Sequence, residues 1–130
     1  MIYPINKEEI REILKEEFES DIVESPFQKI YGYKEEKLCA FIIFDIIYER
    51  MELSYIYVDP SKRNKKIASL LMEFMLEEAK KNGIKEISLE VSCENIKAIS
   101  LYNKYGFKEV AKRSGYYKGI DGLLMIKEVI

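Results

Sequence analysis

The sequence contains no histidine among its 130 residues, and this absence excludes several kinds of active site. Histidine-dependent catalytic triads, zinc sites with histidine ligands and histidine general bases cannot occur. Acid–base chemistry must come from Glu, Asp, Tyr, Lys, Cys or the termini. The two cysteines, Cys39 and Cys93, match no metal-binding spacing. We therefore expect no metal, and two reduced thiols in a cytosolic protein.

Long hydrophobic runs are also missing. The longest run, residues 38–44, is too short to span a membrane, and no signal peptide is visible after Met1. A net charge of −2 does not suggest a general nucleic-acid binder. We expect a cytoplasmic protein that binds neither membranes nor nucleic acid.

The composition that remains is typical of one globular domain. Hydrophobic residues make up 48% and charged residues 34% of the chain, which favours a folded protein over a disordered one. Its length suits a single domain over residues 1–130. Basic residues gather at 62–66 and at 108–118, which suits a small anionic ligand, although a solvated face is the commoner reason for such clusters.

Apolar periodicity predicts alternating strands and helices. We expect helices near residues 7–19 (capped by Asn6), 64–82 and 95–105, and strands near 2–5, 38–48, 51–58, 84–91, 107–112 and 122–129. Residues 27–33 fit a helix or a strand. Counting them as a strand, the order β-α-β-β-β-α-β-α-β-β indicates an α/β or α+β domain with a mixed sheet. The strand at 84–91 should lie parallel to the one that ends at Val58.

The stretch at residues 58–71 runs from a strand through a basic loop into a helix. The first N–H groups of a helix have no partner within the helix, and they carry partial positive charge. Such a site holds a pyrophosphate well. The alternative is an ordinary basic helix start.

Two motifs give this stretch a more specific reading. Arg63-Asn-Lys-Lys-Ile-Ala68 resembles the acyl-CoA pyrophosphate loop of the GNAT acetyltransferase superfamily, Arg/Gln-x-x-Gly-x-Gly/Ala, with Lys66 at the usual glycine. A side chain there would either crowd the phosphate or add a charge to it. The stretch Leu89-Glu-Val…Asn95…Leu-Tyr102…Gly-Phe107 resembles the later motif of the same family. The resemblance implies a mixed, mostly antiparallel sheet whose central parallel pair is splayed at the acyl-CoA site, with helices on both faces.

The C-terminal part resembles one branch of the superfamily, the ribosomal-protein alanine N-acetyltransferases. Its residues are Arg113-Ser-Gly-Tyr-Tyr117, then Asp121-Gly and Met125. Ser92, Glu94 and Gly122 differ from that branch's usual Arg, Ser and Ala, so the match to the branch is less close than the match to the superfamily.

The resemblance implies acetyl-CoA as co-substrate. The backbone of Ile56, Tyr57 and Val58 would meet pantetheine, and one N–H there would polarise the thioester carbonyl. The other cofactor-binding residues implied are Arg63, Asn64, Lys65, Lys66, Ile67, Ala68, Ser69, Asn95 and Tyr102.

Two residues are expected to move protons. Glu90 lies on the polar side of its strand, at the end where ligands of open sheets collect, and matches the branch's general base. Tyr102 matches the family's general acid, since a protonated phenol can donate to a departing thiolate. The ordinary alternatives are a solvated strand glutamate and a packing tyrosine.

The expected activity is acetyl transfer to a primary amine by direct attack. The resemblance favours a protein N-terminal α-amine, and Tyr116 and Tyr117 are candidate walls for it. Acetylation of a small-molecule amine or a lysine side chain is one alternative, and a non-catalytic acyl-CoA-binding module is another. A ping-pong route through Cys93 is disfavoured because the family transfers acetyl directly. The protein should be a monomer or a homodimer.

Overall fold

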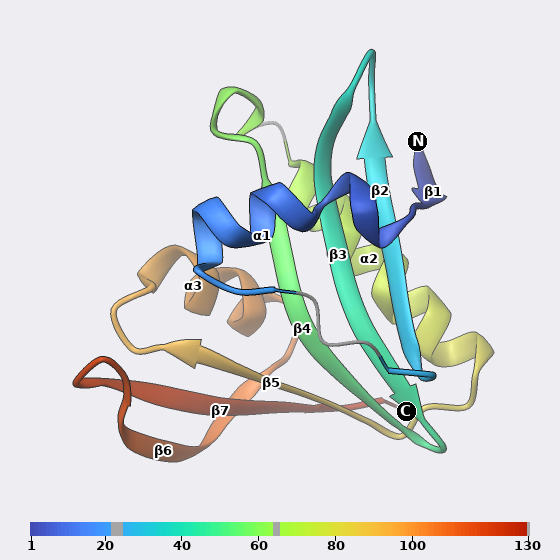
Figure 1. The fold of residues 1–130 in the computed structure, drawn as a ribbon. Helices are drawn as coiled ribbons and strands as arrows, with labels where there is room; N and C mark the ends of the chain where they lie inside the picture. The colour runs from blue at the N-terminus through green and yellow to red at the C-terminus, as the bar shows by residue number, and fades with distance from the viewer. Residues whose placement is uncertain (22–24, 64–65, 130) are drawn as a thin grey trace.

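The structure is a computed structural model that describes residues 1–21, 25–63 and 66–129. The expected order of helices and strands is confirmed (Figure 1). The elements are β1 (Ile2–Pro4), α1 (Arg11–Phe18), β2 (Gln28–Lys34), β3 (Leu38–Ile47), β4 (Arg50–Val58), α2 (Ile67–Lys81), β5 (Glu86–Ser92), α3 (Ile96–Lys104), β6 (Lys108–Tyr117) and β7 (Ile120–Glu128). Short 3₁₀ turns at Lys7–Glu9 and Pro60–Lys62 precede α1 and α2.

The strands form one seven-stranded sheet in the order β1-β2-β3-β4-β5-β7-β6. Only the central pair, β4 and β5, is parallel among the strand pairs of the described residues. The helix α2 makes the crossover between them, as the sequence predicted. The expected fold class, a mostly antiparallel mixed sheet with one parallel pair, is therefore confirmed.

Helices cover both faces of the sheet because β3 is apolar on both sides. Ala40, Ile42 and Phe44 join the larger buried cluster with α2, whereas Phe41 and Ile43 pack against α1 on the opposite face. In Figure 1, α1 lies across the strands β2–β4 in front of the sheet and α2 lies behind them. A strand buried on both faces reads as a continuous hydrophobic run, which explains the sequence of β3.

The sheet opens at its centre. The parallel ladder joins Arg50 to Glu86 at one end and Leu53 to Leu89 at the other, and β4 and β5 then spread apart (Figure 1). At this point Ser54 is an extra residue in β4, because Ile43 pairs with Tyr55 and the next residue of β3 pairs with Leu53. A bulge of this kind bends a strand and increases its twist.

The bulge also changes which side chains face which helix. Before it, Leu53 packs in the cluster beneath α2, but after it Ile56 does so, while Tyr55 and Tyr57 pack toward α1. Side chains alternate along a regular strand, so an extra residue that takes no place in the alternation reverses the facing expected for the residues after it. The sequence alone did not predict this bulge.

Several predicted boundaries are wrong. The first helix is a 3₁₀ turn followed by α1, with Asn6 capping the turn rather than one continuous helix. Residues 27–33 fall mostly in strand β2. The predicted strand that ends at residue 112 continues to residue 117, and the turn of that hairpin lies at residues 118–119. The long helix begins at Ile67 rather than near residue 64.

Candidate functional site

The opening between β4 and β5 is the centre of the candidate site. Beyond Leu53, the strand β4 stays paired with β3 through Val58, while β5 pairs with β7 on its far side. Ile56, Tyr57 and Val58 therefore lie along an edge that faces the opening and has no ladder partner from β5. Free strand-edge N–H and C=O groups are suited to an extended, amide-containing ligand.

The start of α2 is a second candidate binding feature. Lys66 precedes the helix in the left-handed conformation (φ 61°, ψ 21°) and its side chain makes no cap. Among the described residues, the Leu70 N–H donates to the Lys66 carbonyl. The N–H groups of Ile67, Ala68 and Ser69 precede that bond, and such groups attract anions.

Two side chains of the basic loop before α2 already make contacts within the protein. Lys62 Nζ lies 2.8 Å from Glu35 Oε1, and this hydrogen bond raises the pKa of Lys62. Arg63 donates from Nε to the Val58 carbonyl at 3.0 Å, which uses one of five guanidinium donors. The predicted ligands Asn64 and Lys65 lie outside the described residues.

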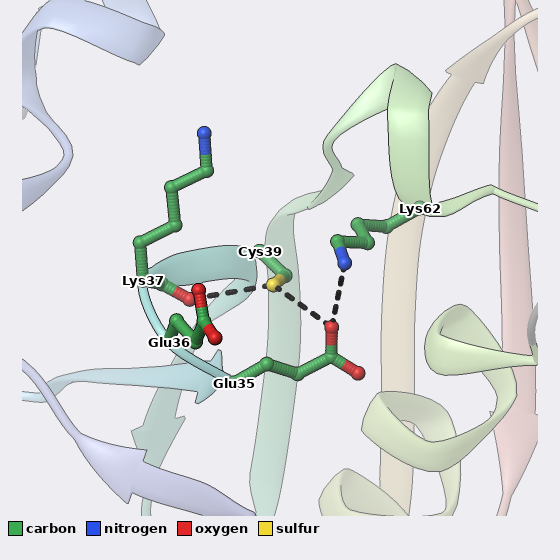
Figure 2. A pocket seen from close by; sticks show the side chains of 5 residues that line it. All are labelled: Glu35, Glu36, Lys37, Cys39 and Lys62. Carbon is green, nitrogen blue, oxygen red and sulfur yellow. Dashed lines mark hydrogen bonds and ion pairs between the residues drawn. The ribbon is translucent and has the colours of Figure 1, made fainter.

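A cavity of about 500 Å³ lies beside this loop. Its lining residues are Glu35, Glu36, Lys37, Cys39 and Lys62 (Figure 2). Cys39 is buried, and its thiol lies 3.3 Å from the Lys37 carbonyl oxygen and 3.8 Å from Glu35 Oε1. Cys39 is thus one of the buried core residues. In this cavity Glu35 already pairs with Lys62 and a second carboxylate, Glu36, lies nearby, so the start of α2 is the better candidate site for an anion.

The helix α3 lies on the same face as α2. Asn95 caps α3 by accepting a hydrogen bond from the Ala98 N–H at 3.2 Å. Tyr102 is buried, and its ring lies 5.9 Å from that of Phe107. Tyr105 ties α3 to the first turns of α2, because its hydroxyl lies 2.9 Å from Glu73 Oε2 and 3.4 Å from the Ser69 carbonyl oxygen.

Glu90 lies on the opposite face of the sheet from Tyr102. Leu89 and Val91 point into the cluster with α2 and α3, so Glu90 between them points to the other side. Its Oε1 lies 3.1 Å from Arg113 Nη2, while its Oε2 is buried and has no hydrogen-bond partner among the described residues. Arg113 was missed as a site residue, although it begins the tail motif noted in the sequence.

Aromatic side chains line the β4 arm of the opening on this same face. The ring of Phe18 lies 5.0 Å from that of Tyr55 and 6.2 Å from that of Tyr57. The Tyr55 hydroxyl is 2.8 Å from the Ser20 hydroxyl. Burial raises the pKa of Tyr57, with Glu17 and Asp59 adding to the effect, so this phenol stays protonated at neutral pH.

The β6–β7 hairpin lies on the β5 side of the opening. Tyr116 is half-exposed and lies beneath the Arg113 guanidinium, whose central carbon is 4.0 Å from the ring centroid. At the turn, Lys118 Nζ lies 2.6 Å from the carboxylate of Glu19 at the end of α1. The Tyr117 side chain is outside the described part of the structure.

Neither a metal cluster nor a membrane span is found in this arrangement. Within residues 1–21, 25–63 and 66–129, no group of three or more His, Cys, Asp or Glu side chains could hold a metal ion. No helix in the same ranges has the length and apolar character needed to cross a bilayer. Cys39 and Cys93 are both free thiols.

Comparisons with known proteins agree with this geometry. The ribosomal protein bS18-alanine N-acetyltransferase of Escherichia coli (strain K12) is 35% identical over 86 residues, which are 66% of this chain and 58% of that protein. The match thus spans less than two thirds of that relative. The crystal structure of the Escherichia coli ribosomal-protein-S18-alanine N-acetyltransferase superimposes with a TM-score of 0.88 at 23% identity, covering 99% of this chain and 93% of that one.

The fold is shared more widely. Ard1 from Thermoplasma volcanium gives a TM-score of 0.85 at 21% identity, with 100% of this chain and 97% of that chain covered. At such identities the likeness concerns the fold alone. The family model described as acetyltransferase (GNAT) family matches residues 2–107. The chain therefore belongs to the acetyltransferase (GNAT) family.

Proposed function

We propose that the protein transfers the acetyl group of acetyl-CoA to a primary amine, and that the amine attacks the thioester directly while both substrates are bound. The observation that carries this proposal is the opening between β4 and β5. It joins a face bearing Glu90 and aromatic side chains to a face bearing the start of α2 and Tyr102. Acceptor and donor can then approach the reacting carbon from opposite sides of the sheet.

The residues on the α2 face fit acetyl-CoA, the acyl donor used in this family. The N–H groups of residues 67–69 suit its pyrophosphate, and the unpaired edge of β4 suits the amides of pantetheine. An N–H on that edge would polarise the thioester carbonyl. We assign the side chain of Asn95 and the backbone of Lys66 to the same ligand.

Glu90 and Tyr102 would carry the two proton transfers. An α-amine has a pKa of roughly 8, so part of it is present at neutral pH as the free amine that attacks. The amine nitrogen then bonds to the carbonyl carbon and the carbon–sulfur bond breaks. Tyr102 would protonate the departing thiolate, and Glu90 would accept the proton lost by nitrogen.

The acceptor we propose is the N-terminal α-amine of a protein. The support is the relatives named ribosomal protein bS18-alanine N-acetyltransferase. Half-exposed Tyr116 on β6 and the aromatic residues on β4 form walls suited to a peptide backbone. A small-molecule amine or a lysine side chain is the alternative acceptor.

Thiol release from acetyl-CoA tests these roles. We expect turnover with a peptide that begins with alanine, little with the same peptide blocked at its N-terminus, and less with a polyamine. Glu90→Gln and Tyr102→Phe should each lower kcat by roughly 10²- to 10⁴-fold. Glu86→Gln is the matched control, because Glu86 lies on the same face of β5 but at the closed end of the ladder.

Three outcomes would contradict parts of the proposal. CoA binding by the wild type without turnover on any amine would favour a non-catalytic binding module. Unchanged kcat in both variants would remove the catalytic assignment. Equal kcat/KM for the polyamine and the free peptide would remove the N-terminal preference.

A further inference from the structure

Glu90 and Arg113 lie on one face of the three strands beyond the opening. In the ladder, Glu90 pairs with Leu124 of β7, and Arg113 of β6 pairs with Gly122, two residues from Leu124 on the same face. Gly122 presents no side chain between them. The long Arg113 side chain can therefore cross β7 and reach the carboxylate on β5.

The contact with Arg113 holds one oxygen of the Glu90 carboxylate. Arg113 Nη2 lies 3.1 Å from Glu90 Oε1. One face of the guanidinium packs on the Tyr116 ring, with 4.0 Å between the central guanidinium carbon and the ring centroid. A planar guanidinium stacked on a ring has fewer accessible rotamers than a free side chain. Exposure differs across the pair, since 59% of the Arg113 side chain and 22% of the Glu90 side chain are exposed.

The second oxygen of the Glu90 carboxylate, Oε2, takes no part in the contact with Arg113. Glu90 Oε2 is buried without a hydrogen-bond partner in the described part of the chain. Leaving a buried acceptor unpaired typically costs about 1–3 kcal/mol, so such groups in a native protein call for a reason. The ion pair with Arg113 supplies one reason, because it fixes the carboxylate in the orientation that buries Oε2.

We infer that Arg113 is a positioning residue for Glu90: it holds Oε1, and thereby fixes the orientation of the carboxylate beside the opening. The inference rests on the proposed function, because it assigns Glu90 as the proton acceptor. Tyr116 acts one step further away by holding the guanidinium. Arg113 itself does not take part in the proton transfer.

The variants Arg113→Met and Arg113→Lys test this role, with Lys112→Met as the control. Lys112 is the neighbouring cation on β6 and pairs with Leu123, on the other face. Arg113→Met should lower kcat by roughly 10- to 100-fold, because misplacing a reacting group has effects of this size. KM for acetyl-CoA and the thermal midpoint should stay near wild type. Arg113→Lys should recover part of kcat, and Lys112→Met should leave it unchanged.

A double-mutant cycle separates this inference from the proposed function. If Arg113 acts through Glu90, adding Arg113→Met to Glu90→Gln should cause little further loss of kcat. Additive losses would overturn the positioning role while leaving Glu90 as the base. An Arg113→Met variant that only raises KM for the peptide would make Arg113 an acceptor-binding residue instead. An unchanged kcat in Glu90→Gln alone would overturn the assignment of Glu90 as the proton acceptor, and this inference with it.

Discussion

At the scale of single residues, Lys66 shows why the family motif uses glycine at this position. Its φ of 61° lies in the left-handed region, where a non-glycine residue typically costs about 1–2 kcal/mol. From the sequence alone, the Lys66 side chain was expected either to crowd the bound phosphate or to add a positive charge beside it. The backbone conformation adds a third reason, since glycine adopts this region without a steric penalty.

Lys66→Gly and Lys66→Ala together separate conformation from charge. Glycine removes the strain and the charge, whereas alanine removes only the charge. We expect Lys66→Gly to raise the free energy of unfolding by up to about 1 kcal/mol in a urea titration, after allowing for the flexibility of glycine in the unfolded chain. CoA affinity, measured by calorimetry, should hold or improve in Lys66→Gly. A similar large loss of affinity in both variants would show instead that the ammonium group binds a phosphate.

Asp45 gives a pH-dependent prediction. Burial raises the pKa of this carboxyl, and its Oδ1 has no hydrogen-bond partner among the described residues. At neutral pH the group is charged in both the folded and the unfolded chain, so the folded state bears the desolvation penalty. Asp45→Asn should therefore be more stable than wild type at pH 7.

This advantage should shrink as the pH falls through the raised pKa, because the wild-type carboxyl then becomes neutral in the folded protein. Urea titrations of the two proteins from pH 7 to pH 4 measure the difference. Glu52→Gln is the control, because Glu52 is the exposed cross-strand partner of Asp45. A constant difference across this range would contradict the assignment of burial as the cause.

Residue facing was predictable where it follows local alternation. Glu90 was expected on the polar side of its strand from Leu89 and Val91, and it lies there. Its ion pair with Arg113 was not predicted, because it depends on the register of two further strands. The roles of Glu90 and Tyr102 in proton transfer stay predictions.

At the scale of elements, hydrophobic periodicity predicted the order of strands and helices, but it missed the bulge in β4. Residues 51–58 read as one regular strand because apolar residues continue on both sides of Ser54. The inserted residue is visible only from the pairing with β3. Local pattern thus predicts that a strand exists, whereas its facing beyond a bulge depends on its neighbour.

Deletion of Ser54 is a direct test of the bulge. It should leave Leu53, Tyr55 and Ile56 on their present faces, because Ile43 with Tyr55 and Phe44 with Leu53 then become consecutive pairs of a regular ladder. It should remove the bend and extra twist of β4, so CoA binding should weaken while the free energy of unfolding changes less. Ser54→Ala keeps the residue count and should stay near wild type in both measurements. A deletion variant with wild-type CoA affinity would show that the bulge does not shape the opening.

At the scale of the whole molecule, the sheet consists of two halves joined by a short parallel ladder of four residue pairs. The helix α1 packs on one half, and the β6–β7 hairpin belongs to the other. The ion pair between Glu19 and Lys118 links them although these residues are 99 positions apart. The crossover helix made the parallel pair predictable, but no local pattern reveals a contact at this separation.

This ion pair yields a prediction about acceptor selectivity. Both side chains are largely exposed, so Glu19→Gln or Lys118→Met should change the thermal midpoint little. Each should raise KM severalfold for a peptide acceptor but leave KM for a small primary amine near wild type. The reason is that the contact joins the end of α1 to the β6–β7 hairpin, the two sides of the proposed acceptor site. The charge-exchanged variant Glu19→Lys/Lys118→Glu should restore the peptide KM, and high salt should reproduce the single variants. If both acceptors were affected equally, the ion pair would not be shaping the peptide side of the opening, and its role would be limited to the local order of the hairpin turn.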